Sequence, residues 1–170
     1  GGTGVGALAV LNPQAGKNYG FSATGSNVVL DITNAGVISD WTADADGSWN
    51  TSGNWSGPVP NGQGETGNFG QALTAPRTVT LDGNKTLGAI SFNGGAAPLG
   101  YTIAQGSSGS LALDNGLSQA NLIVSSGANT ISADVSINSA TAVAAVASGA
   151  SLTVSGSIGG TGGLIKSGSG

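Results

Sequence analysis

The feature that most constrains the fold is a short apolar pattern that recurs along the chain from Thr78 onward. In most copies apolar and polar side chains alternate, as Val79 and Leu81 do with the threonines beside them. Alternation with a period of two is typical of a β-strand that buries one face. The recurring pieces are TVTLD (78–82), AISFN (89–93), YTIAQ (101–105), SLALD (110–114), NLIVS (121–125), NTISADVSI (129–137), TAVAAVA (141–147), SLTVS (151–155) and GLIKS (163–167).

The spacing of these pieces narrows the architecture. Their starts lie about 9 to 12 residues apart, and Gly- and Asn-rich turns separate them. Such spacing suits a sandwich, a barrel or a β-solenoid. Short strands, abundant small residues and only 7% charged residues favour the solenoid, because its coils stack like side chains on one another. We expect an all-β solenoid over 78–170, with two strands in a coil of about 20 residues and about four or five coils.

One piece has an alternative interpretation. The stretch around 141–147 is rich in alanine, which has the highest helix propensity. We predict a strand there, because the turn SGA and the strand-like SLTVSG follow it in the same rhythm.

Composition excludes several classes of function. The chain of 170 residues has no Cys, His or Met, so disulfides and thiolate metal sites are excluded. The net charge is −4, and the four basic residues Lys17, Arg77, Lys85 and Lys166 are scattered, which argues against nucleic acid as a partner. No apolar run approaches the roughly 20 residues of a transmembrane helix, so we expect no transmembrane segment. No signal peptide is visible, and an opening Gly1 in place of Met indicates a mature protein or a fragment.

The first 77 residues follow a different pattern. We expect a β-strand segment at 1–40, with a hairpin around Thr24, Gly25 and Ser26. This segment is either the end of a preceding unit or an assembly arm. Residues 41–77 contain all three tryptophans and no sustained periodicity, and we interpret them as a Trp-, Gly- and Pro-rich capping loop. Together these parts would form a β-rich N-terminal capping region in front of the coils at 78–170.

Four aromatic residues stand out in that region: Trp41, Trp49, Trp55 and Phe69. They allow two interpretations. Aromatic faces can stack on sugar rings and form a glycan platform. Alternatively they cover the open end of the core, burying roughly 150–250 Å² each. We favour the second interpretation.

The acidic residues suggest no catalytic centre. Asp44, Asp46 and Ser48 have the one-three-five spacing of a calcium loop, but its twelfth position, where a Glu is needed, is Trp55. We therefore interpret this stretch as an Asx-rich turn and expect no metal. The other carboxylates are spread along the chain without the pair that glycosidases need. We expect no catalytic residues, no cofactor and no enzymatic activity.

Three segments carry a family resemblance. The stretch GSWNTSGNW (47–55), with PNGQGETGNFG and RTVTLDGNKTLGAISFNG after it, resembles the opening of bacterial proteins with autotransporter-associated β-strand repeats. GSIGGTGGLIKSGSG (156–170) resembles the start of such a repeat, and YGFSATGSNVVLDIT (19–33) is similar to the segment that often ends a preceding array. The resemblance covers about two thirds of the chain and implies a right-handed β-helix in a large secreted or surface protein.

These observations lead to a functional expectation. A β-helix exposes unpaired backbone groups at its ends, and natural edges are blunted by charge, proline or a cover. The last piece, Gly163, Leu164, Ile165, Lys166 and Ser167, has one lysine and no proline, so we expect an assembly edge there. We expect an extracellular structural protein, part of a fibre, sheath or stalk, that pairs head to tail with other copies or with the rest of a longer chain. The alternative is a surface adhesin that binds glycans. A polysaccharide-active enzyme is suggested by fold analogy alone.

Overall fold

The computed structural model describes residues 8–12, 17–34 and 36–170 of the chain. These residues form β-structure nearly throughout, with a single short 3₁₀ turn in this part of the chain, at Ser52–Asn54. The fold is therefore all-β, as the sequence predicts. The chain divides into two compact units between residues 35 and 36.

The described part of the first unit contains the expected hairpin. Strand β1 (Lys17–Thr24) pairs antiparallel with β2 (Asn27–Asn34), so Gly25 and Ser26 form a two-residue turn. Gly25 has a φ of 61°, and no residue other than glycine has a positive φ among those described. A positive φ at the first central position alone is the requirement of a type II′ turn, which matches the twist of hairpin strands.

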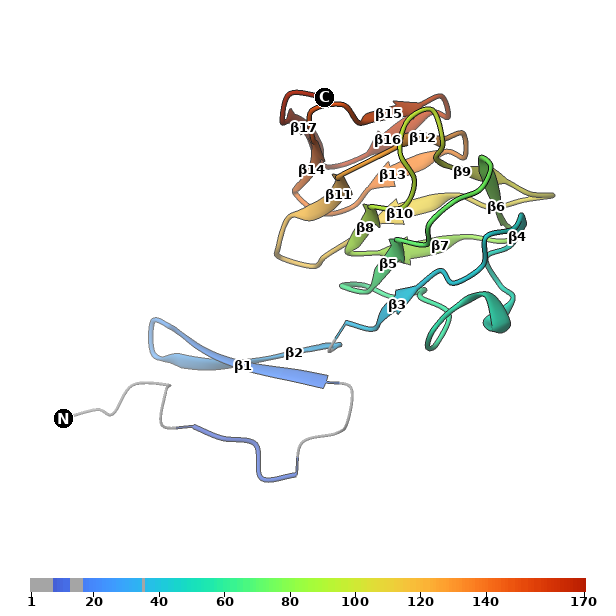
Figure 1. The fold of residues 1–170 in the computed structure, drawn as a ribbon. Coiled ribbons are helices and arrows are strands. Elements are labelled where there is room, and N and C mark those ends of the chain that lie inside the picture. The colour runs from blue at the N-terminus through green and yellow to red at the C-terminus, as the bar shows by residue number, and fades with distance from the viewer. Residues whose placement is uncertain (1–7, 13–16, 35) are drawn as a thin grey trace. The chain divides into compact units, whose positions relative to one another are not determined.

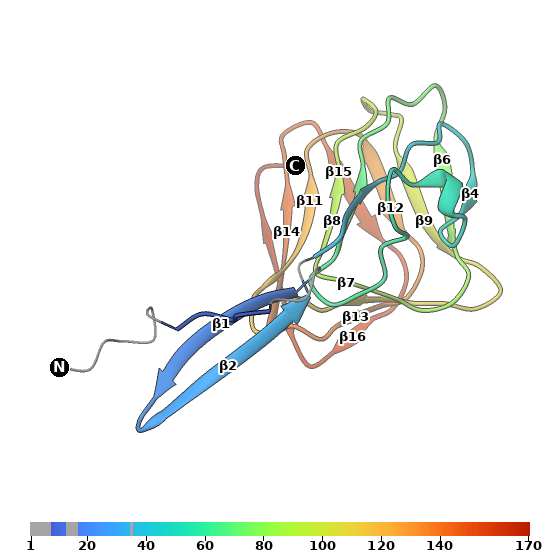
Figure 2. The same ribbon diagram turned by 90° about the horizontal axis from the view of Figure 1, so that it is seen from below.

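The second unit is a β-solenoid of about five turns, built from three parallel sheets. Figure 1 shows its strands stacked in layers from β3 to β17, and in Figure 2 the three sheets surround a common interior. Sheet I contains β3 (Ile38–Asp40), β5 (Thr66–Phe69), β8 (Ala89–Phe92), β11 (Ala120–Val124), β14 (Thr141–Val146) and β17 (Gly163–Ser167). Sheet II contains β4 (Gly47–Ser48), β6 (Arg77–Leu81), β9 (Tyr101–Gln105), β12 (Ala128–Ile131) and β15 (Ser151–Val154). Sheet III contains β7 (Lys85–Leu87), β10 (Leu111–Leu113), β13 (Val135–Ile137) and β16 (Ile158–Gly160).

Each complete coil therefore has three strands, and the expected two strands per coil is wrong. The stretch 129–137, expected as one piece, is split between β12 and β13, and β7 was not expected at all. The strands of sheet III have only three residues, too few for a period of two to be recognised. The Ala-rich stretch 141–147 contains β14 and is a strand, as predicted.

The stack also begins earlier than the expected boundary at residue 78. Strand β3 pairs with β5, and β5 pairs with β8, so residues 38–40 and 66–69 already belong to the stack. The division between 35 and 36 likewise differs from the expected one at residue 40. These early strands have two to four residues and lie between irregular segments, so their periodicity is hidden in the sequence.

Equivalent positions of successive coils form ladders of buried side chains. Leu87, Leu113 and Ile137 pair across sheet III, and all three are buried. Close stacking at the corners explains some of the glycines: a Cβ at Gly100 would overlap the backbone carbonyl of Ala128 in the next coil. Backbone pairing and small corner residues thus set the distance between coils.

Candidate functional site

The first candidate is the aromatic cluster at the β3 end of the solenoid. Trp41 follows β3, Trp49 follows β4, Trp55 follows the 3₁₀ turn, and Phe69 is the last residue of β5. All four side chains are buried. The ring centroids of Trp49 and Trp55 lie 4.8 Å apart, and those of Trp49 and Phe69 lie 5.5 Å apart. The cluster is therefore part of the core at its first coil.

The polar edge of every indole in this cluster is hydrogen-bonded. The Nε1–H groups donate to backbone carbonyls: Trp41 to Ala43 at 2.8 Å, Trp49 to Pro60 at 2.9 Å and Trp55 to Trp49 at 2.8 Å. Buried indoles need such partners. With the ring faces packed and the ring edges bonded, no indole face is open for stacking on a sugar in this arrangement.

The aromatic core extends further than the sequence indicated. Phe69 stacks on Phe92 in the next coil, with centroids 5.3 Å apart, and contacts Tyr101 at 5.1 Å. Phe92 and Tyr101 were placed in strands by their alternation but were not linked to the tryptophans. Phe92 pairs with Phe69 one coil away, and this spacing is recognisable only once the coil length is known. Tyr101 lies in sheet II, so no spacing from Phe69 indicates its contact.

Residues 49–65 replace a third strand in the first coil and cover the edge of sheet III. The side chain of Asn61 accepts a hydrogen bond from the backbone N–H of Thr86 in β7, at 2.9 Å. Gly64 N–H donates to the carbonyl of Asp114, and Ser39 Oγ donates to the carbonyl of Pro58. This segment closes the β3 end, as a natural sheet edge requires.

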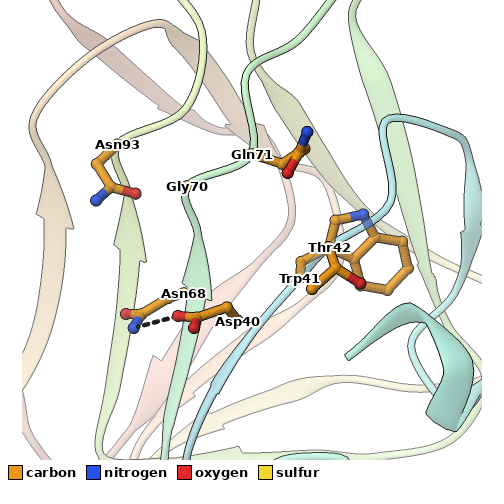
Figure 3. Close-up of a pocket in the computed structure, with 7 residues that line it drawn as sticks. All are labelled: Asp40, Trp41, Thr42, Asn68, Gly70, Gln71 and Asn93. Atoms are coloured by element: carbon orange, nitrogen blue, oxygen red, sulfur yellow. Dashed lines mark hydrogen bonds between the residues drawn. The ribbon is translucent and has the colours of Figure 1, made fainter. Parts of the chain in front are cut away.

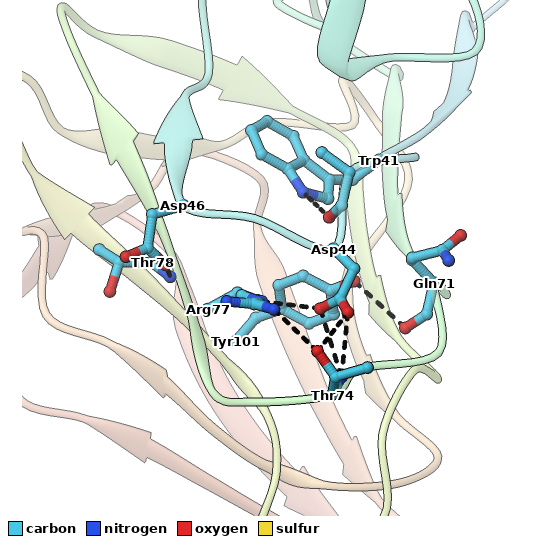
Figure 4. A network of polar contacts seen from close by, with 9 residues as sticks. Trp41, Asp44, Asp46, Gln71, Thr74, Arg77, Thr78 and Tyr101 are labelled. Carbon is cyan, nitrogen blue, oxygen red and sulfur yellow. Dashed lines mark hydrogen bonds and ion pairs between the residues drawn. The ribbon is translucent and has the colours of Figure 1, made fainter.

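The second candidate is a polar network on the side of the first coils, drawn in Figure 4. Arg77 Nε donates to Asp44 Oδ1 at 2.7 Å, and the Thr74 hydroxyl donates to Asp44 Oδ2 at 2.6 Å. These hydrogen bonds lower the pKa of Asp44 to about 2. Nearby, the Tyr101 hydroxyl donates to the carbonyl of Gln71. Burial raises the pKa of Tyr101 to about 12. The network ties the loop after β3 to the loop before β6.

The carboxylates of the calcium-like stretch are thus used within the chain. Asp44 holds Arg77 and Thr74, while Asp46 Oδ1 accepts the backbone N–H of Thr78 at 2.7 Å. The Ser48 hydroxyl accepts the N–H of Asn50. Across residues 8–12, 17–34 and 36–170, no group of three or more His, Cys, Asp or Glu side chains is arranged to hold a metal ion.

The third candidate is a hollow of about 310 Å³ at the corner after β3, β5 and β8. Asp40 Oδ1 accepts a hydrogen bond from Asn68 Nδ2 at 3.0 Å on one side of it, and the amides of Gln71 and Asn93 lie apart from this pair in Figure 3. The lining combines polar groups, with a single carboxylate among them, and apolar surface that includes Trp41, so it suits a neutral hydroxyl-rich ligand better than an ion. No motif or periodicity in the sequence marks these residues.

The fourth candidate is the opposite end of the solenoid, where β15, β16 and β17 form the last layer. No strand of the described residues pairs with their outer edges. Leu164 and Ile158 are 44% and 48% exposed, although their neighbours one coil back, Ala142 and Val135, are buried. A hollow of about 320 Å³ opens there, lined mainly by Ala144, Val146, Leu152, Val154, Ile158 and Leu164, and Lys166 also lines it. We call this surface the open end.

The expected assembly edge at 163–167 is strand β17, the edge strand of sheet I. Gly163 N–H donates to the carbonyl of Ala140, next to β14. Because N–H groups alternate in direction along a strand, those of Leu164 and Lys166 point away from β14. The edge can therefore accept a further strand without disturbing its existing pairing.

One charged residue is buried without an ion pair to offset its burial. Lys85 in β7 is 5% exposed, and the salt bridge found among the described residues joins Arg77 to Asp44 instead. Burial lowers the pKa of Lys85, and the charge of Asp82 opposes this shift. The sequence identified this lysine only as one of four scattered cations.

No protein-family model, curated protein or solved structure matches the chain. Within the described residues, none of the helical structure is long and apolar enough to cross a membrane. The geometry of the site is therefore the basis for any functional assignment.

Proposed function

We propose that this chain is an extracellular structural protein, a β-solenoid segment of a fibre, sheath or stalk. It lengthens at its open end by adding further β-structure, supplied by other copies or by the rest of a longer chain. The observation that carries the proposal is the difference between the two ends: one is closed by residues 49–65 over the aromatic cluster, and the other leaves an apolar layer uncovered.

Two further observations support it. The chain has only 12 charged residues, 4 basic and 8 acidic, so long-range repulsion between copies is small. Its segments also resemble those of autotransporter-associated β-strand repeat proteins, a family of large secreted and surface proteins. An extended rod outside the cell is the role that both observations favour.

Sedimentation velocity over a concentration series tests the proposal. The 170-residue chain should associate as its concentration rises, and negative-stain images should contain elongated particles. Leu164→Lys should shift the chain toward the monomer, because it replaces an apolar side chain of this layer with a second charge beside Lys166. The matched control is Ile165→Lys, whose side chain points to the opposite side of β17 and is 54% exposed. A monodisperse wild-type monomer at millimolar concentration would refute extension by other copies and leave only extension by the rest of a longer chain.

A second variant tests the role of the strand edge. Lys166→Pro removes an N–H that points away from β14, so the pairing within sheet I is retained while a further strand loses a donor. We expect weaker association with an unchanged circular dichroism spectrum. If Lys166→Pro associates as strongly as the wild type, the contact is made by side chains and not by backbone pairing at the edge of β17.

A surface adhesin that binds glycans is the second candidate, and the hollow beside Asp40 favours it. Trp49 and Trp55 would not take part, whereas Trp41 lines the hollow. Titration of neutral monosaccharides into isotope-labelled protein should shift the side-chain amide signals of Gln71 and Asn93 if this function exists. Asn93→Ala should abolish the shift of the Gln71 signal, and the absence of both shifts in the wild type would remove the candidate.

A further inference from the structure

The hairpin of the first unit has one apolar face. In an antiparallel pair, directly opposed residues project to the same side of the ribbon. The register of β1 and β2 therefore places six such side chains on one face: Tyr19, Phe21, Ala23, Val28, Leu30 and Ile32. On the other face the register places Gly20, Ser22 and Val29. The ribbon is thus amphipathic.

An isolated ribbon of two strands is marginally stable in water and gains stability when its apolar face is covered. Val28, Leu30 and Ile32 are all exposed, at about half of their surface. Phe21 lies directly opposite Leu30 in the register, at the centre of this face. The face has the composition of a surface that packs on another apolar layer.

The open end of the solenoid is an apolar layer of the same kind. Leu152, Val154, Ile158 and Leu164 lie around its hollow, at the inward-facing positions of the last coil. One chain therefore carries two apolar β-surfaces, one on a ribbon and one at the end of a stack.

The two surfaces belong to different units of the chain. Both are apolar β-surfaces, so a second copy of the chain carries a matching surface for each of them.

We propose that the hairpin of one copy lies with its apolar face on the open end of a second copy. This proposal rests on the proposed function and names its partner surface. The contact joins two different surfaces, so it is heterologous, and each added copy brings one more ribbon and one more open end. Such contacts propagate into a filament.

The size of the contact predicts its strength. A ribbon of eight-residue strands is about 26 Å long and about 10 Å wide, so it covers roughly 260 Å² of the partner. Stable interfaces bury about 800 Å² per partner. A single contact is therefore weak, and association depends on high concentration or on many copies in a row.

Cysteine cross-linking tests the contact cleanly, because the chain has no cysteine of its own. The double variant Leu30→Cys with Leu164→Cys is treated with a short bis-maleimide at high concentration. A ladder of covalent dimers, trimers and larger species is expected on a denaturing gel. The matched control is Val29→Cys with Ile165→Cys, which moves each cysteine by one residue to the opposite face at similar exposure, 45% for Val29 against 44% for Leu30. The control ladder should be at least tenfold weaker.

Single variants separate the alternatives. Leu164→Cys alone should give little cross-linking, and efficient dimers from it would mean that two open ends meet, which overturns the hairpin contact but leaves the proposed function standing. An internal cross-link in the double-cysteine monomer would also overturn it, by placing the contact within one chain. If Leu164→Lys abolishes association while Leu30→Lys does not, the hairpin is not the partner. Absence of any association in the wild type overturns the hairpin contact and, with it, extension of the solenoid by other copies.

Discussion

At the β3 end of the solenoid, Trp49 is fully buried beneath residues that bond to the edge of sheet III, whereas at the β17 end Leu164 is 44% exposed. The large aromatic rings are concentrated near the first end, while β14, near the second, contributes the buried Ala142 and Ala144. The same strand geometry thus produces a finished end and an unfinished one. The comparison shows that the strands alone do not close an end of the solenoid. The β3 end is closed by the inserted segment 49–65.

The largest expected effect comes from breaking the closed end. Trp49→Ala should lower the free energy of unfolding by about 3–5 kcal/mol, because it removes a fully buried ring together with its hydrogen bond to Pro60. Urea unfolding followed by circular dichroism measures this change. Leu117→Ala is the control, since Leu117 is 99% exposed, and it should change stability by less than about 0.5 kcal/mol. An unchanged midpoint for Trp49→Ala would mean that the cluster does not hold the closed end together.

A second comparison concerns the packing between coils and the open end. Gly100→Ala should destabilise the protein by about 1–3 kcal/mol, because the new Cβ would overlap the carbonyl of Ala128. Gly163→Ala, in β17, should be close to neutral, since no atom lies within 4 Å of its Cβ position. Thermal unfolding of both variants measures the difference. Equal effects would contradict the tighter packing between the inner coils.

The polar network near the closed end should respond to pH. The pKa of Asp44 is lowered from 3.8 to about 2 in the folded protein, chiefly by the hydrogen bond from Arg77. Because the pKa of Asp44 is lower in the folded protein than in the unfolded chain, the ionised carboxylate stabilises the fold at any pH above the unfolded-state pKa. This contribution is therefore present above about pH 4 and is lost as the pH falls toward 2. Asp44→Asn should therefore unfold at a lower temperature than the wild type at pH 6 and at nearly the same temperature at pH 2. A difference that persists at pH 2 would assign the effect to geometry instead of charge.

The smallest expected change in stability comes from replacing one of two lysines at inward-facing positions. Lys85 is buried in β7, and Lys166 lies at the open end, where its ammonium group donates to the carbonyl of Gly168. Lys85→Met should raise stability by about 1 kcal/mol, because it removes a charge that burial disfavours. Lys166→Met should leave the stability of the monomer unchanged and strengthen association. A loss of stability in Lys85→Met would show that its charge is well compensated.

Much of the fold could be predicted from local patterns. The alternation in 78–82 and 151–155 placed β6 and β15, and the Gly25-Ser26 turn placed the hairpin, because these features depend on neighbours in sequence. The three-residue strand β7 and the split between β12 and β13 could not be predicted, since one inward pair of side chains has no recognisable period. Of the site, the edge strand at 163–167 was identified in advance, and the hollow beside Asp40 was not.

Residues that meet across coils are harder to predict for a physical reason. Asp44 and Arg77 are 33 positions apart, and their contact depends on the lengths of the corners between them. Those lengths vary: Asn121 pairs with Ala89 one coil before it and with Val143 one coil after it, at separations of 32 and 22 residues. No constant repeat can be applied to the whole chain.

By itself, the sequence determined that this protein is built from short strands with one buried face, stacked with few charges, because alternation and turn residues act over a few positions. Only the tertiary structure decided that each coil has three sides, that the tryptophans lie inside, and that one end is covered while the other is open. Those properties depend on which residues of neighbouring coils lie against each other. The lengths of the corners and the packing of the core together decide these contacts.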